Sequence, residues 1–338
     1  MKQDAETPGQ ATSTLSSSLK NSLRRPIRAV TAALVVLACA AGVAACARSN
    51  SDSHFYRGYN PDFPLNASIE SVEEKEAYRR EHFYFDSNAE HRIPALMALP
   101  HQDGPHPLII FVHGVGQSKE FLDEIAEPFV EAGFAKVTFD QYDRGERSLE
   151  EAGPIRRTWA MRRRTALTVN EIRRLIDYAQ SREDLDHERV YLVGASFGAI
   201  TGATAAAFED RIQAAVLTYG GGHLPTLFLS PAVKEEIGFL VYPLRYVAWA
   251  FFYPADPIHH VADISPRPIL MQNGSEDKLI PPKSAERLYD AAREPKEIIW
   301  YEGDHIGLDE EAVEEVIDDS IEWLLKQDKR VRNAGKKP

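Results

Sequence analysis

The stretch from Val190 to Gly198, VYLVGASFG, most constrains what this chain can fold into. It opens with a short apolar run of β-forming residues that stops at a glycine, which is typical of a buried strand. The small residues AITGATAAA follow and favour a helix packed closely on a sheet. A strand, G-x-S-x-G and a helix in this order predict a sharp turn that lifts Ser196 above the sheet edge. We expect glycines on both sides because a side chain there would clash or would need a positive φ.

Composition limits the classes of protein to which the chain can belong. With 338 residues and 43% hydrophobic content, it can bury one sizeable core. A formal charge of −12 and the lack of a basic stripe argue against nucleic-acid binding. The two cysteines, Cys39 and Cys46, lie in an N-terminal apolar run, so the body offers neither disulfides nor thiolate chemistry.

The N-terminal 45 residues resemble a bacterial lipoprotein signal peptide. A basic stretch ending at Arg28 precedes an uncharged, mostly apolar run over 29–45, which is short for a membrane span. Val43-Ala44-Ala45-Cys46 resembles a lipobox, in which Cys46 is lipidated and becomes the mature N-terminus. Cys39 fits less well, and a plain signal peptide or an uncleaved anchor stays open. We therefore expect a protein exported to the cell envelope and membrane-anchored there, with a polar tether over 46–66.

The body, residues 67–328, alternates strand-like and helix-like segments and ends in a polar basic tail over 329–338. Residues 70–81 are charged and predict a helical lead-in. The predicted strands cover 82–85, 93–99, 107–112, 134–139, 190–195, 212–219, 268–272 and 298–301. The first two surround a polar turn and predict an antiparallel entry hairpin. The predicted helices cover 119–133, 159–180, 285–293 and 309–327. Continuous apolar strands alternating with helices predict a mostly parallel sheet with helices on both faces.

The segment over 220–264 interrupts this alternation because it is too long for a connection. It holds roughly fifteen large apolar residues, including Trp249 and Phe252. We expect these residues to need burial and to form an inserted cap that selects the substrate. An extra pair of core helices and a membrane-surface patch are the alternatives.

Three polar residues follow the ends of predicted strands, in the order Ser196, Asp277 and His305. A serine hydroxyl is a weak nucleophile at neutral pH, so it needs a base and a third group that orients that base. The carboxyl ends of parallel strands lie at one sheet edge, where α/β folds place their ligands. The sequence therefore predicts a catalytic triad of these three residues.

Five motifs together resemble the α/β-hydrolases of the dienelactone-hydrolase-like and prolyl-oligopeptidase-like groups. They are HGVG at 113–116, DQYDRGER at 140–147, GASFG at 194–198, GSED at 274–277 with Pro281, and GDH at 303–305. The resemblance covers roughly residues 80–328 and implies the α/β-hydrolase fold: a mostly parallel central sheet, helices on both faces and an inserted cap. Dienelactone hydrolases proper use a cysteine nucleophile. Since this chain has Ser196 at the elbow, their substrate does not carry over.

The family pattern also selects among competing acids. It places the acid three residues after a glycine, which favours Asp277 over Glu276. Asp304 adjoins His305, and adjacent side chains diverge. These two acids are therefore weaker candidates.

Other residues have structural explanations. His259 and His260 lie in the expected cap and are more often structural or surface histidines, and His113 is expected to hydrogen-bond backbone. Asp140, Asp143 and Arg144 either shape the loop beside the site by a salt bridge or form a solvated loop. The arginine-rich segment 156–164 reads as a solvated helix face.

The resemblance implies an oxyanion hole formed by the backbone N–H groups of Val115 and Phe197. No cofactor or metal motif is present in the sequence. The expected function is a serine hydrolase that cleaves small-molecule carboxylic esters through an acyl-enzyme on Ser196. A serine peptidase of the prolyl-oligopeptidase type is the alternative, although the chain has no room for the usual propeller. An inactive, hydrolase-like binding protein is a further alternative, which an intact triad disfavours.

Overall fold

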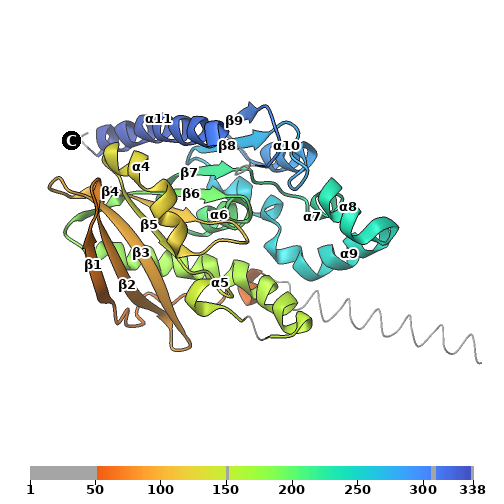
Figure 1. Ribbon diagram of the computed structural model, residues 1–338, viewed down its shortest axis with the longest axis horizontal. Coiled ribbons are helices and arrows are strands. Elements are labelled where there is room, and N and C mark those ends of the chain that lie inside the picture. The colour runs from red at the N-terminus through yellow and green to blue at the C-terminus, as the bar shows by residue number, and fades with distance from the viewer. Residues whose placement is uncertain (1–51, 150–151, 306–309, 336–338) are drawn as a thin grey trace, which may run out of the picture. The chain divides into compact units, whose positions relative to one another are not determined.

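A nine-stranded sheet forms the centre of the computed structural model, which describes residues 52–149, 152–305 and 310–335 (Figure 1). The strands are β1 (Ser68–Glu74), β2 (Tyr78–Asn88), β3 (His91–Pro100), β4 (His106–Val112), β5 (Ala135–Phe139), β6 (Leu185–Ala195), β7 (Ile212–Thr218), β8 (Ile269–Gly274) and β9 (Lys296–Tyr301). Their order is β1-β2-β3-β5-β4-β6-β7-β8-β9. The strands from β5 onward in this order pair in parallel, whereas β1, β2 and β3 pair antiparallel. The α/β-hydrolase fold expected from the sequence is confirmed.

Helices cover both faces of the sheet. They are α2 (Asp52–Phe55), α3 (Leu122–Ile125), α4 (Glu127–Glu131), α5 (Pro154–Gln180), α6 (Phe197–Phe208), α10 (Pro282–Ala291) and α11 (Glu310–Ala334). Successive residues of a strand point to opposite faces. In β4, Ile109 and Phe111 therefore pack with Trp323 of α11, while Leu108 and Ile110 pack with Ile172 of α5. These two apolar layers hold the parallel strands rigidly, and the strand ends carry the candidate site.

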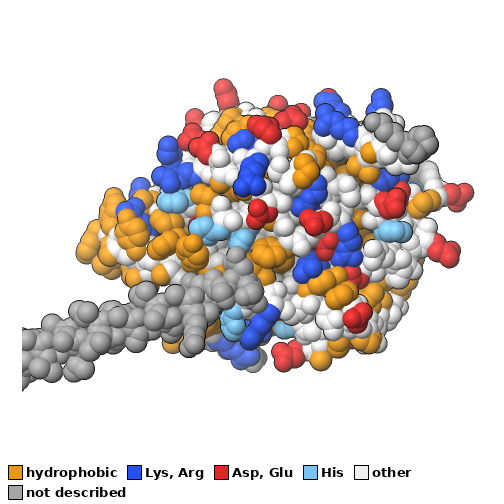
Figure 2. Space-filling view, turned by 180° about the vertical axis from the view of Figure 1, so that it is seen from behind, with side chains coloured by type: hydrophobic (Ala, Val, Ile, Leu, Met, Phe, Trp, Pro, Cys, Tyr) orange, Lys and Arg blue, Asp and Glu red, His pale blue; other side chains and the backbone are white. Residues whose placement is uncertain are grey.

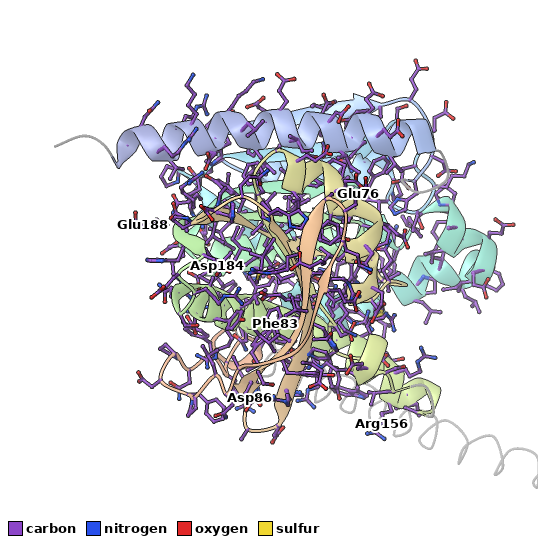
Figure 3. All side chains as sticks on the ribbon, turned by 60° about the vertical axis from the view of Figure 1, so that its left-hand side comes forward. Glu76, Phe83, Asp86, Arg156, Asp184 and Glu188 are labelled. Carbon is purple, nitrogen blue, oxygen red and sulfur yellow. The ribbon has the colours of Figure 1, made fainter. Side chains whose placement is uncertain are left out.

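The antiparallel part differs from the helical lead-in expected over 70–81, so that prediction is wrong. β1 is exposed along its whole length as the edge strand, and β2 alternates between buried and half-buried residues. Phe83 of β2, which Figure 3 labels, stacks on Tyr178 of α5 with ring centroids 4.7 Å apart. Apart from the buried Glu81, the charged residues of this region thus lie on exposed or half-buried sides of the strands.

Both predicted boundaries of the body shift in the structure. Part of the expected tether over 46–66 packs on the body, since the Tyr56 hydroxyl donates to the Pro254 carbonyl at 2.6 Å. At the other end, α11 continues to Ala334 and passes the predicted boundary at 328. The signal segment over 1–45 and Cys46 lie outside the described residues.

The inserted segment forms α7 (Leu224–Leu227), α8 (Pro231–Ile237), α9 (Val241–Phe252) and short 3₁₀ turns. Figure 1 shows α8 and α9 projecting away from the sheet. The expectation that its large apolar residues would be buried is wrong for eight of them, which are exposed: Ile237, Phe239, Leu240, Tyr242, Leu244, Tyr246, Val247 and Tyr253. Within the described ranges, no helix combines the length and apolar character that a membrane crossing requires.

Candidate active site

Ser196 stands at the junction between β6 and α6. Its backbone has φ 56° and ψ −119°, a conformation that residues other than glycine rarely adopt. The Ser196 N–H donates to the Thr218 carbonyl at 2.8 Å, which joins the turn to the end of β7. This turn is strained by about 1–3 kcal/mol, and it puts the hydroxyl at the carboxyl edge of the sheet.

The glycines beside the turn are required by close packing. A Cβ on Gly198 would lie 1.8 Å from the Val112 carbonyl oxygen, and one on Gly194 would lie 2.5 Å from the Gly198 carbonyl oxygen. Neither glycine has a positive φ. Of the two reasons expected for the glycines, the clash is therefore the one that applies.

The structure brings the three predicted triad residues together. His305 Nε2 lies 2.9 Å from Ser196 Oγ, and His305 Nδ1 lies 2.7 Å from Asp277 Oδ2. Asp277 follows β8 and His305 follows β9, so the three side chains come from the ends of β6, β8 and β9. This geometry allows the imidazole to accept the serine proton while the carboxylate holds the opposite ring nitrogen.

Asp277 is buried, and both of its oxygens are occupied. Oδ1 accepts hydrogen bonds from the N–H groups of Leu279 at 2.8 Å and Ile280 at 2.7 Å, which leaves Oδ2 for His305. These bonds fix the orientation of the carboxylate.

The competing acids face other partners. Asp304 Oδ1 accepts from the Lys278 N–H at 2.8 Å, and Oδ2 pairs with Lys278 Nζ at 2.9 Å. These contacts, with the hydrogen bond from the His305 N–H, lower the pKa of Asp304 to about 2. Glu276 is exposed, and its N–H donates to the Gly303 carbonyl. The contacts of both acids support the choice of Asp277.

The alternative histidines have structural environments. His113 is fully buried, its Nδ1 lies 2.9 Å from the Gly114 carbonyl oxygen, and burial lowers its pKa to about 4. His260 is buried with Nε2 3.2 Å from the Pro254 carbonyl oxygen, and His259 is exposed against the Tyr253 ring. His305 itself packs edge-on against the ring of Tyr219, with centroids 5.5 Å apart.

One expected oxyanion donor, Phe197, follows Ser196 directly, and the other, Val115, follows Gly114, on which a Cβ would lie 3.6 Å from Ser196 Cβ. In the described part of the chain, the backbone N–H groups of Val115 and Phe197 have no hydrogen-bond partner. The Gly114 N–H, by contrast, donates to Gln117 Oε1 at 2.9 Å. Arg144 Nε donates to the Val115 carbonyl oxygen. Gln117 and Arg144 therefore hold the loop that carries one donor.

The loop over 140–147 is a folded ion-pair network and not a solvated loop. Asp140 is fully buried and accepts from the Lys119 N–H at 2.9 Å and from the Glu146 N–H at 2.9 Å. Lys119 Nζ lies 3.2 Å from Asp140 Oδ2. The salt bridge expected within the loop is present between Arg144 Nη1 and Asp143 Oδ2 at 3.8 Å, and the Lys119–Asp140 pair adds a contact that was not predicted.

The expected solvated face over 156–164 is wrong for two of its arginines, although Arg163 between them is exposed. Arg162 and Arg164 are buried, and Arg164 Nη2 lies 3.6 Å from Asp143 Oδ2. Burial lowers the pKa of Arg164 to about 10, and its guanidinium lies 5.6 Å from the centroid of the Phe197 ring. Arg164 stands four residues before Thr168 and eight before Ile172, both buried. This helical spacing was the available signal for its burial.

The described residues contain no group of three or more His, Cys, Asp or Glu side chains placed to hold a metal ion.

The part of the chain that contains the triad resembles known proteins. The family model described as the dienelactone hydrolase family matches residues 93–327. Esterase YjfP of Escherichia coli strain K12 is 28% identical over 214 residues, which cover 60% of this chain and 82% of that protein.

Solved structures of esterases share the fold. Acetyl xylan esterase 1 from Thermoanaerobacterium sp. JW/SL YS485 superimposes with a TM-score of 0.63 at 18% identity, over 82% of this chain and 92% of that chain. Acetyl xylan esterase from Paenibacillus sp. R4 gives a TM-score of 0.63 at 19% identity, over 80% and 91% of the two chains. At these identities the likeness concerns the fold alone.

Proposed function

Because the chain belongs to the dienelactone hydrolase family of hydrolases, we propose that it cleaves carboxylic esters through an acyl-enzyme on Ser196. The observation that carries the proposal is the continuous chain of contacts from Ser196 Oγ through His305 to Asp277, at 2.9 and 2.7 Å. The name of the E. coli relative, an esterase, supports the choice of ester over amide.

In the acylation step, His305 Nε2 takes the proton of Ser196 as Oγ attacks the ester carbonyl carbon. The carbonyl oxygen becomes an oxyanion, which accepts from the N–H groups of Val115 and Phe197. The hole is worth several kcal/mol, because removing one donor from such a hole costs about 3–4 kcal/mol. Protonated His305 then gives its proton to the leaving alcohol, and an acyl-serine remains.

In the deacylation step, neutral His305 takes a proton from a water molecule that attacks the acyl carbonyl. The second tetrahedral intermediate collapses to the carboxylic acid and regenerates Ser196. Asp277 stays ionised throughout and stabilises the imidazolium.

A fluorophosphonate probe tests the nucleophile. We expect covalent labelling of the full chain at Ser196, loss of labelling in Ser196→Ala and unchanged labelling in Ser71→Ala, a control on the exposed edge strand β1. Labelling that persists in folded Ser196→Ala protein would refute the assignment.

A substrate panel tests the reaction class. We expect turnover of p-nitrophenyl acyl esters of graded chain length and none of prolyl-peptide amides. Preferential cleavage of the amides would favour the peptidase alternative. Turnover of neither class by a chain that the probe labels would contradict the proposed substrate class.

We also propose that Cys46 is lipidated and attaches the protein to the bacterial cell envelope. The support is the sequence Val43-Ala44-Ala45-Cys46 after a short apolar run. Ala47 follows the cysteine in place of aspartate, which by resemblance to sorting rules gives no signal for inner-membrane retention in a Gram-negative host.

A further inference from the structure

The projecting part of the cap exposes a large apolar surface, which we call the cap face. It consists of Phe239, Leu240, Tyr242, Leu244, Tyr246 and Val247. Phe239 is 80% exposed and Val247 is 66% exposed. Figure 2 shows hydrophobic side chains gathered at this end of the molecule, on the left of the view. Contiguous exposed apolar surface of this kind marks an interaction site in soluble proteins.

The apolar surface extends beyond the cap to the N-terminal end of α5. Ile155 and Trp159 of α5 are 77% and 53% exposed. The Trp159 ring packs against Phe251 of α9 with centroids 4.9 Å apart, which connects the two elements. The same elements carry exposed charges, namely Arg156 of α5, labelled in Figure 3, and Lys234 of α8, which is followed by Glu235 and Glu236.

The chain enters the described body close to this surface. Tyr56 donates to the Pro254 carbonyl just after α9, and the Phe55 ring lies 4.7 Å from the guanidinium of Arg162 in α5. Only the six residues 46–51 separate the apolar run over 29–45 from Asp52. Fully extended, they span about 20 Å. A membrane that holds the N-terminal segment therefore lies within reach of the cap face.

We propose that the cap face and the N-terminal end of α5 rest on the surface of a phospholipid bilayer. Tyrosine and tryptophan are enriched at membrane–water interfaces because they combine an apolar ring with a polar atom. Tyr242, Tyr246 and Trp159 supply exposed rings of this kind, in addition to the apolar side chains of Phe239 and Val247. The formal charge of −12 opposes attraction to an anionic surface, so the contact is mainly apolar.

The proposal rests on the proposed membrane attachment for its distance argument, and it does not depend on the esterase reaction. The alternative occupant of an exposed apolar face is a second copy of the chain. The bilayer is favoured because Cys46, the proposed lipidation site, precedes Asp52 by only six positions in the sequence, while nothing comparable brings a second copy to this face.

Tryptophan quenching tests the contact directly. The full chain is reconstituted into phosphatidylcholine vesicles that contain increasing fractions of bromine-labelled phosphatidylcholine. Bromine quenches tryptophan only near contact, so a body that merely hangs from its N-terminal segment is not quenched. We expect quenching in the wild type and weaker quenching in Trp159→Phe. Of the other three tryptophans, the half-buried Trp249 on α9 of the cap keeps part of the signal, whereas Trp300 and Trp323 lie on β9 and α11.

Two matched double variants test whether a loss of quenching is specific to the cap face or follows from added negative charge anywhere on the protein. Phe239→Glu with Val247→Glu should abolish the quenching. Ile69→Glu with Val72→Glu makes the same kind of change on the exposed edge strand β1 and should leave it unchanged. Both pairs are checked for folding by circular dichroism, and neither lies in the catalytic machinery.

Three outcomes overturn the proposal. The first is wild-type emission that bromine-labelled lipid does not quench, and the second is equal quenching in both double variants. The third is concentration-dependent dimerisation that the cap-face variant abolishes, with no quenching in vesicles, which would assign the surface to a second copy. Ester hydrolysis is not measured in this experiment. A failure of the proposed bilayer contact can therefore be distinguished from a failure of the proposed ester hydrolysis.

Discussion

Replacing Asp277 with asparagine removes the negative charge and the acceptor atom that faces His305 but keeps nearly the same side-chain shape. The substitution therefore tests whether catalysis needs the carboxylate itself. The native Oδ1 accepts from the Leu279 and Ile280 N–H groups at 2.8 and 2.7 Å. In Asp277→Asn these two donors retain the amide oxygen, because turning the amide round would point its NH₂ group at two N–H groups. The amide NH₂ therefore replaces Oδ2, which lies 2.7 Å from His305 Nδ1.

An N–H donor at that position forces His305 to carry its proton on Nε2, which faces Ser196 Oγ at 2.9 Å. The imidazole can then no longer take the serine proton. The same substitution in a serine protease lowers kcat about 10⁴-fold, or roughly 5.5 kcal/mol of transition-state stabilisation. We expect a loss of this size, measured as kcat for a short p-nitrophenyl ester, with an unchanged folded structure by circular dichroism.

Asp304→Asn is the matched control, since Asp304 adjoins the same histidine. Its amide oxygen can still accept from the Lys278 and His305 N–H groups, and only the exposed ion pair with Lys278 Nζ is lost. Exposed pairs contribute about 0–1 kcal/mol, so kcat should fall less than tenfold. The reasoning is refuted if Asp277→Asn stays within tenfold of the wild type while Asp304→Asn abolishes activity.

Three further predictions concern the anchor, the cap and the core. Cys46→Ser should abolish incorporation of a radiolabelled fatty acid, and persistent labelling would refute lipidation at Cys46. Trp249→Ala or Phe252→Ala should change the ratio of kcat/KM between short and medium acyl esters about tenfold or more if these half-buried rings contact substrate, whereas an unchanged ratio with lowered stability would make them structural. Burial lowers the pKa of Lys136 well below its ordinary 10.5, so the unfolded chain binds more protons and native stability rises with pH up to about 10.5. Lys136→Met should be more stable than wild type at pH 7, and its advantage, measured by urea unfolding, should shrink by up to about 1.4 kcal/mol per pH unit towards pH 9; an advantage independent of pH would contradict the depressed pKa.

The parallel half of the sheet could be predicted because its strands are buried on both faces. Such strands are continuous apolar runs, as in PLIIFV of β4, and each is followed by a turn signal. The residue that follows each strand end could then be identified. This reasoning selected Ser196, Asp277 and His305, which the structure brings within hydrogen-bonding distance.

The antiparallel entrance to the sheet could be predicted only in part: the hairpin expected from the runs at 82–85 and 93–99 is confirmed by the pairing of β2 with β3, but the strands over 70–81 were missed. Glu81 of β2 is buried, but its charge is compensated by Arg182, whose Nη1 lies 2.8 Å from Glu81 Oε2. These partners are separated by 101 positions in the sequence. Without the partner in view, a charged residue indicates an exposed surface and favours a helix. The prediction over 70–81 failed because long-range pairing overrides local pattern.

The loop that carries the Val115 oxyanion donor is also held partly by contacts between residues far apart in the sequence. Gln117 holds Gly114 from three residues away, but Arg144 holds the Val115 carbonyl from 29 residues away. Arg144 is in turn held by a loop whose Asp140 binds the Lys119 backbone. The sequence identifies the donor loop by its position after β4, since that position is a property of the strand order. Apart from Gln117, the residues that hold the loop in place come from the loop after β5, which Arg164 of α5 contacts in turn, so they emerge only when β4 and β5 are seen to lie side by side.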